Sequence, residues 1–314
     1  MRYRCILIAA LLLALALNIC ACGVEVHVPA DSRLTVTDHM GRQVDVPRQP
    51  QRVAALIGSF AQVWQLAGGR LCAAPEDAWE DFGLESDEVV NLGGAHSPGL
   101  EALLSSQPQL VIASASTAAD LELEQPLTQL NIPVLYFDVD NFEDYLDMLR
   151  ICTQITGRDD LYEQNGLALR ARIQQLKNEL AAADIPEQHR RVLLLRASSG
   201  SVKAKSSRGT VLGEMLADIG CINVADSDST LLERLSAESI IEAQPYRIFV
   251  VTMGSDTRAA LDNLSRMLYE DGAWSALEAV REQRVHIMDK KLFNLKPNHR
   301  WAEAYEQLCN IFMQ

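Results

Sequence analysis

Apolar and polar residues alternate along two short segments near residue 40. Leu34 to Asp38 and Gln43 to Val46 place apolar side chains at alternate positions, around the turn sequence His39-Met40-Gly41-Arg42. A period of two is typical of a strand with one buried face, and two such runs around a glycine-containing turn are typical of a hairpin. The pattern therefore predicts a small β-hairpin.

Continuous apolar runs follow this hairpin and are separated by stretches with helical periodicity. Arg52 to Leu56 predicts a buried strand, and we expect a helix after it, near Ala61 to Leu66. Further strand-like runs are Leu110 to Ser114 and Val134 to Phe137. Strands that alternate with helices predict an α/β fold with a mostly parallel sheet.

An internal repeat extends this pattern over the rest of the chain. Residues 101–112 recur 137 positions later as residues 238–249, and Arg52 to Leu56 recurs 139 positions later as Arg191 to Leu195. In both copies a helix beginning near the glutamate should end before the proline, because the residue before proline disfavours helix. The repeat predicts two similar α/β lobes.

Residues 159–183 carry an apolar stripe at helical spacing and charges elsewhere. The stripe consists of Leu161, Leu167, Leu169, Ile173, Leu176 and Leu180. Gly157 precedes the segment and Pro186 follows it. At about 1.5 Å per residue such a helix is roughly 40 Å long. One long rigid helix between two lobes predicts a cleft between them, which is where small ligands usually bind.

The first residues have the pattern of a signal peptide. Arg2 and Arg4 precede an apolar run from Ile6 to Ile19, which is too short to cross a bilayer as a helix. The run ends in Ile19-Cys-Ala-Cys22-Gly, which resembles the bacterial lipoprotein box and implies lipid attachment at Cys22. An ordinary cleaved signal peptide is the alternative. Either way we expect an extracytoplasmic protein, on the outer face of the cytoplasmic membrane or in a periplasm.

We therefore expect two Rossmann-like lobes, each with a central mostly parallel sheet, joined by one long helix with a ligand cleft between them. The predicted parts are a signal peptide at 1–21, a tether at 22–33, an N-terminal lobe at 34–142, a helical connection at 143–184 and a C-terminal lobe at 185–314.

The net charge of −14 argues against a nucleic-acid partner and against electrostatic attachment to anionic lipid.

The cysteines after the signal region lack the spacing of a metal or redox pair and lie in apolar stretches; they are Cys72, Cys152, Cys221 and Cys309. Buried free thiols are expected, with disulfides as the alternative. The chain has no Gly-x-Ser-x-Gly, no phosphate-binding Gly-Lys loop and no His-Glu-x-x-His, so we expect no enzyme.

Short motifs in a fixed order run through residues 34–314. They are Thr37-Asp38 with Gly41-Arg42, Val46-Pro47, Arg52-Val53, Gly94, Pro98 to Glu101, Pro108 to Val111, Leu235 to Glu238, Pro245, Trp274, Ala279-Val280, Arg284-Val285 and Asn294 to Trp301. In this order the chain resembles the substrate-binding lipoproteins of bacterial ABC importers, in the helical-backbone class that handles iron-siderophore complexes, heme and cobalamin. Gln109 stands where that family usually has aspartate, which should change a turn contact.

The resemblance implies a monomer with no cofactor of its own. It traps its ligand between the lobes, and a permease with a cytoplasmic ATPase completes transport. Glu101 and Glu238 match the family's docking residues, which pair with permease arginines and fix orientation. The simpler alternative is that each glutamate only favours the N-terminus of its helix.

Loops after the carboxyl ends of parallel strands should border the cleft. The candidate ligand-binding residues are Ser59, Phe60, Trp79, Phe82, His96, Ser97, Lys203, Lys205, Arg208, Lys296 and Arg300. Lys203, Lys205 and Arg208 suit an anionic ligand, such as heme or a ferric chelate. Trp79 and Phe82 could form an apolar wall for a macrocycle. Solvated loops and ordinary packing remain the alternatives.

One further residue role, one other ligand class and one other function stay open. His96 is a candidate axial ligand to heme iron. A related importer class binds bare zinc or manganese through histidines and carboxylates, but the six histidines here are scattered along the chain. An adhesion or scaffolding lipoprotein without transport is the third alternative.

Overall fold

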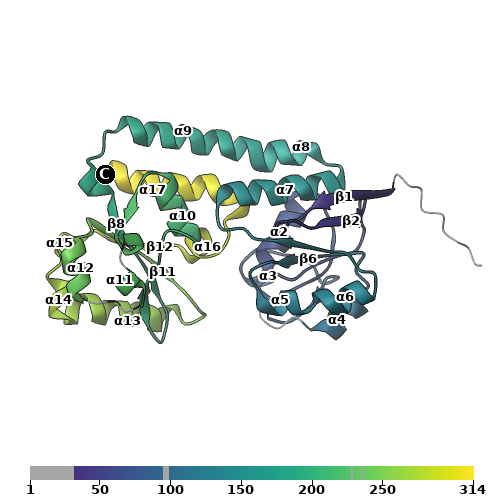
Figure 1. The fold of residues 1–314 in the computed structure, drawn as a ribbon, viewed down its shortest axis with the longest axis horizontal. Coiled ribbons are helices and arrows are strands. Elements are labelled where there is room, and N and C mark those ends of the chain that lie inside the picture. The colour runs from purple at the N-terminus through teal and green to yellow at the C-terminus, as the bar shows by residue number, and fades with distance from the viewer. Residues whose placement is uncertain (1–31, 95–98, 228, 234, 236) are drawn as a thin grey trace, which may run out of the picture. The chain divides into compact units, whose positions relative to one another are not determined.

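The computed structural model describes residues 32–94, 99–227, 229–233, 235 and 237–314 (Figure 1). Within it, Leu34–Gln314 forms one compact unit. The predicted hairpin is confirmed as β1 (Arg33–Thr37) and β2 (Gln43–Pro47). The Asp38 carboxylate holds its turn by accepting hydrogen bonds from the backbone nitrogens of Met40 and Arg42, at 3.1 and 3.0 Å.

The first parallel sheet has the strand order β5-β4-β3-β6-β7. Its strands are β3 (Val53–Ala55), β4 (Leu71–Ala74), β5 (Val90–Asn91), β6 (Leu110–Ser114) and β7 (Val134–Phe137). The helices between and beside these strands are α2 (Gly58–Leu66), α3 (Asp77–Glu80), α4 (Leu100–Ser105), α5 (Ala118–Glu122) and α6 (Glu124–Gln129). Every residue of β6 and β7 is buried, as expected of parallel strands with both faces covered.

The second sheet has the order β10-β8-β11-β12, all parallel, with β9 antiparallel to β8 at one side. Its strands are β8 (Arg191–Ala197), β9 (Val202–Ala204), β10 (Ile222–Asn223), β11 (Arg247–Thr252) and β12 (Val285–Met288). Its helices are α10 (Val211–Asp218), α11 (Ser229–Glu233), α12 (Ala237–Ala243), α13 (Thr257–Glu270), α14 (Gly272–Ser275), α15 (Glu278–Arg281) and α16 (Lys290–Phe293). We call residues 34–142 the N-terminal half and residues 185–314 the C-terminal half.

The predicted connecting helix is helical from Asp159 to Ala182, in three consecutive parts. They are α8 (Asp159–Tyr162), a π-helical turn (Glu163–Leu167) and α9 (Ala168–Ala182). Before it, α7 (Phe142–Thr156) starts with a capping box between Asn141 and Asp144 and ends at Gly157, whose positive φ closes the helix.

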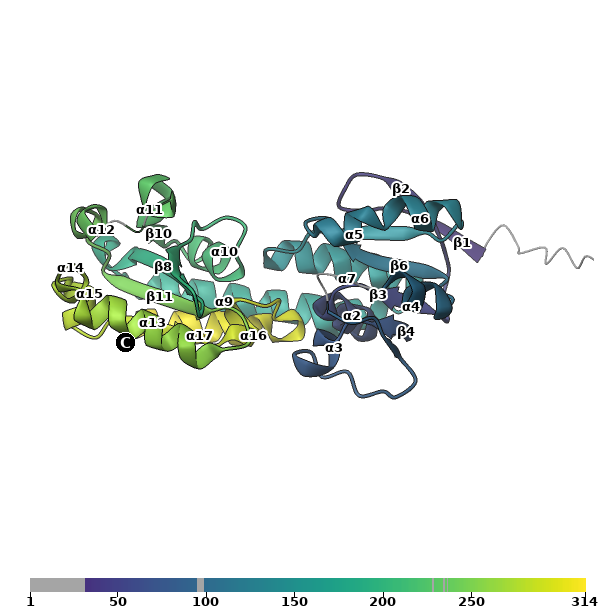
Figure 2. The ribbon, with the colours of Figure 1, turned by 90° about the horizontal axis from the view of Figure 1, so that it is seen from below.

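The expectation of a single helix joining two lobes is incomplete. The C-terminal helix α17 (Trp301–Met313) lies beside α9, and an ion pair of 2.5 Å joins Arg172 to Glu306 (Figures 1 and 2). Ile173 and Leu176 of α9 share one buried apolar cluster with Leu308 of α17. That cluster also includes residues of both sheets, because the long helices cover one side of each.

Three further predictions can be compared with the described residues: a helix start, the contact of Gln109 and the state of the cysteines. The helix predicted near Ala61 begins earlier, at Gly58. Gln109, which replaces the usual aspartate, accepts hydrogen bonds through Oε1 from the backbone nitrogens of Gln51 and Arg52, at 2.7 and 3.1 Å. The four cysteines expected to be free are free, and Cys221 is the one that is only partly buried. Among the residues described, no helix is both long and apolar enough to span a bilayer.

Candidate ligand site

Three basic side chains lie together at the carboxyl end of β8. Arg196 pairs directly with Lys203 on β9, and residues opposite each other in an antiparallel pair point to the same face. Lys205 is two positions further along, so it shares that face as well. We call Arg196, Lys203 and Lys205 the basic cluster. The sequence predicted its two lysines on a loop, whereas a short strand presents the first of them.

The environment of the basic cluster is unfavourable for its charges. Arg196 is half-buried, and its Nε has no hydrogen-bond partner in the described part of the chain. Burial lowers the pKa of Arg196. The pKa of Lys205 is lowered first by burial and then by the positive charges of Arg196 and Lys203. An anion bound here would relieve the repulsion and supply the missing hydrogen-bond acceptor.

The cluster borders the edge of the sheet where the parallel strands end. Arg196, Val251 and Met288 form one row across β8, β11 and β12. Asp289 follows Met288 and caps α16. The first residue of this helix, Lys290, donates from Nζ to the carbonyl oxygen of Gly254 at 3.5 Å. Arg208, the other predicted basic residue of this region, follows on the loop before α10 with an exposed side chain.

The predicted aromatic residues lie on α3 and the loop after it. Trp79 and Phe82 are both half-buried. Trp79 Nε1 donates to the carbonyl oxygen of Ser86 at 3.2 Å, and the carbonyl oxygen of Phe82 accepts from Gln62 Nε2 at 2.8 Å. Both residues are therefore held in place while remaining partly exposed.

The side chains of Ser59 and Phe60 are buried in this structure, and their role in ligand binding stays a prediction. They are 2% and 3% exposed, and the Phe60 ring packs edge-on against Phe137. The reason is the close approach of α2 to α3. A Cβ atom at Gly58 would lie 2.7 Å from the backbone nitrogen of Ala78, so the first turn of α2 is packed beneath α3.

Lys296 and Arg300 do not join the basic cluster either. Lys296 forms an ion pair of 3.1 Å with Asp140, and Arg300 forms one of 2.7 Å with Glu303. Between them, the buried Asn298 donates from Nδ2 to the carbonyl oxygen of Ser59 at 2.9 Å. This segment therefore fixes the start of α17 against the N-terminal half, a role that these charges did not reveal in the sequence.

For five other residues the sequence prediction also stays a prediction. Cys22, His96 and Ser97 lie outside the described residues. Glu101 is exposed in the first turn of α4. Glu238 belongs to α12, the equivalent helix of the second repeat.

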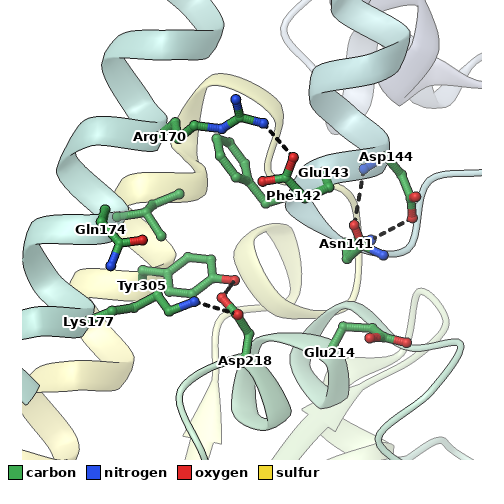
Figure 3. A pocket seen from close by; sticks show the side chains of 11 residues that line it. Asn141, Phe142, Glu143, Asp144, Arg170, Gln174, Lys177, Glu214, Asp218 and Tyr305 are labelled. Carbon is green, nitrogen blue, oxygen red and sulfur yellow. Dashed lines mark hydrogen bonds and ion pairs between the residues drawn. The ribbon is translucent and has the colours of Figure 1, made fainter. Parts of the chain in front are cut away.

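A cavity of about 340 Å³ lies beneath α9, where the start of α7 meets α10 and α17 (Figure 3). Arg170 pairs with Glu143 on one side of it. On the other side the Asp218 carboxylate accepts from Lys177 Nζ at 2.6 Å and from the Tyr305 hydroxyl at 2.7 Å. These paired charges attach α9 to α7 on one side and to α10 of the C-terminal half on the other. This cavity could not be predicted from the sequence, because its lining comes from four distant segments.

No group of three or more histidine, cysteine, aspartate or glutamate side chains is arranged to hold a metal ion within residues 32–94, 99–227, 229–233, 235 and 237–314.

Residues 53–292 match the model of a family described as periplasmic binding protein. A vitamin B12-binding protein of Pectobacterium atrosepticum is 24% identical over 204 residues, which are 64% of this chain and 71% of that protein. Staphylococcus aureus SirA complexed with staphyloferrin B has a TM-score of 0.67 at 18% identity, over 88% of this chain and 96% of that one. S. aureus IsdE complexed with heme has a TM-score of 0.68 at 16% identity, over 84% and 99%. These two structures show a shared fold, and since the family model covers more than half of the sequence, the chain belongs to the periplasmic binding protein family.

Proposed function

We propose that this chain is the solute-binding lipoprotein of an ABC uptake transporter and captures a ligand that carries an anionic group. The basic cluster is the observation that carries this proposal, because Arg196 is half-buried with an unpartnered Nε and its neighbours are also positive. The carboxylates of a ferric chelate or of heme would provide the anion, and so would the phosphodiester of cobalamin. The similar proteins whose names mention staphyloferrin B, heme and vitamin B12 support the same range.

The physical advantage of this site is that the cations are already partly desolvated. A hydrogen bond with an ionised partner is about twice as strong as a neutral one, and partial burial reduces the competition from water. The accessible faces of Trp79 and Phe82 would add apolar contact with a ring system. The ligand would thus be held by charge from the C-terminal half and by aromatic contact from the N-terminal half.

The remaining parts of the proposal concern location and delivery. Lipid on Cys22 would keep the protein at the membrane and raise its local concentration near the permease. Glu101 and Glu238 would dock on the permease, since each stands near the start of the equivalent helix in its repeat. The chain itself would perform no covalent chemistry.

The test uses protein that begins at Gly23 and records visible spectra with heme, ferric siderophores and cobalamin, alongside tryptophan quenching titrations. Arg196→Met should weaken binding of the ligand found by about 10- to 100-fold, because a hydrogen bond to a charged group contributes roughly 1.5 to 3 kcal/mol. Arg158→Met is the matched control, since Arg158 is exposed and its ion pair among the described residues is with Asp160. Unchanged affinity in Arg196→Met, or no binding across the whole panel, would refute the proposal.

A further inference from the structure

A lysine of the C-terminal half reaches the N-terminal half next to the candidate ligand site. Lys291 Nζ donates to the carbonyl oxygen of Glu80 at 3.1 Å and to that of Asp81 at 3.5 Å. It also lies 3.5 Å from the Asp81 carboxylate. The last carbonyl groups of a helix have no partner within that helix, so the end of α3 readily accepts a cation. One ammonium group therefore joins two segments that lie 210 positions apart.

The contact matters because α3 carries the aromatic loop. We define the aromatic loop as residues 79–86. Its local bonds run from Leu84 N to the carbonyl oxygen of Ala78 at 2.9 Å and from Trp79 Nε1 to the carbonyl oxygen of Ser86. These bonds make α3 and the loop one unit. Whatever holds the end of α3 also sets the position of Trp79.

The neighbouring lysine makes a useful contrast. Lys290 belongs to the same helical turn, but its ammonium bonds to Gly254 within the C-terminal half. Lys291 alone of the two crosses to the other half. The helix α16 starts directly after the row that contains Arg196, so Lys291 and the basic cluster border the same edge of the sheet.

We propose that Lys291 is a positioning residue of the ligand site, which holds the aromatic loop against the C-terminal half. The position of Trp79 then depends on a single ammonium group. This inference rests on the proposed function for the identity of the site. The contact is partly exposed, so high salt should weaken it.

Tryptophan fluorescence provides the test, since Trp64, Trp274 and Trp301 are at most 3% exposed whereas Trp79 is half-buried. Acrylamide quenching of the ligand-free protein should increase in Lys291→Met and stay unchanged in Lys290→Met. Asp81→Asn should give a smaller increase, because the two carbonyl acceptors remain. Trp79→Phe in each background assigns the signal to Trp79.

A second measurement follows the dissociation rate of the ligand found in the binding panel. Lys291→Met should release it about two- to fivefold faster, which is the range for a partly exposed ion pair. Equal quenching in Lys291→Met and wild type, or the same increase in Lys290→Met, would overturn the inference. The quenching arm needs no ligand, so a panel without binding would reject the proposed function and leave the Lys291 result standing.

Discussion

Arg52 and Arg191 make the same contact in the two copies of the internal repeat. Arg52 Nε donates to the carbonyl oxygen of Ser106 at 3.0 Å, and Arg191 Nη2 donates to that of Ala243 at 2.8 Å. In each case an arginine at or just before the start of a strand caps the end of a helix. The next residue, Gln107 or Gln244, has a positive φ of 48° or 44° before its proline. The repeat seen in the sequence is thus a repeated helix-to-strand connection.

That connection predicts an unusual effect of glycine at position 107. A left-handed conformation costs a residue with a Cβ atom roughly 1 kcal/mol, whereas glycine adopts it freely. Gln107→Gly should therefore be more stable than Gln107→Ala by about 1 kcal/mol in urea unfolding. The same pair of changes at Gln62, inside α2, should show the opposite order, because glycine weakens a helix interior. If the alanine variant were more stable than the glycine variant at both positions, the left-handed conformation of Gln107 would be contradicted.

The buried carboxyl group of Asp120 should make stability depend on pH. Burial raises its pKa from 3.8 to about 7, and Oδ2 accepts a hydrogen bond from Ser114 N at 2.7 Å. Because the folded pKa is the higher one, the folded protein binds more protons between pH 4 and 7. Its contribution is fully present below pH 4 and is lost as pH rises through 7.

Asp120→Asn removes this titration and can keep the bond from Ser114. We expect the variant to gain stability relative to wild type as the pH rises from 5 to 8, by at most about 3 kcal/mol. Urea unfolding at both pH values measures the difference, and Asp262→Asn on α13 serves as a control. A constant offset between variant and wild type across this range would reject the assignment.

The hydroxyl of Tyr305 should contribute to stability beneath α9. It is the donor to Asp218, and burial raises the pKa of this tyrosine, so it stays a donor at neutral pH. Tyr305→Phe should lower the free energy of unfolding by about 1 kcal/mol. Tyr269→Phe is the matched control, because Tyr269 is 60% exposed and should tolerate the change. Similar losses in the two variants would argue against a specific role for the hydroxyl.

The tight contact between α2 and α3 predicts that Gly58→Ala is destabilising. The added methyl group would meet the backbone of Ala78 and the Asp77 carboxyl group at less than 3 Å, and a backbone neighbour cannot easily move. We expect a loss of about 1 to 3 kcal/mol in thermal or urea unfolding. Gly200→Ala has nothing within 4 Å of the new atom and should be near neutral. Wild-type stability in Gly58→Ala would show that α3 can shift.

Much of the fold could be predicted from local patterns. The hairpin, the buried strands and the long helix each leave a periodic signal over a few consecutive residues. The repeat added the relation between the two halves, because proline at positions 108 and 245 ends a helix in the same way in both. The boundaries were less certain, as the early start of α2 at Gly58 shows.

The candidate site was predicted only in part. Lys203 and Lys205 were predicted because their charges stand close together in the sequence, and Trp79 because its loop was expected to border the cleft. Arg196 was missed, since it lies inside an apolar strand and becomes a neighbour of Lys203 only through the pairing of β8 with β9. Lys296 was assigned to the ligand, but Asp140, which lies 156 positions away, neutralises it.

The sequence by itself therefore determined the elements, their order and the repeat, because helix and strand preferences depend on neighbouring residues. Only the tertiary structure decided which charges are paired and which remain available. Strand register placed Lys203 beside Arg196, and the contact of α16 with α3 placed Lys291 beside Asp81. The energy of a charge depends on its neighbours in space and on its burial, and neither quantity can be read along the chain.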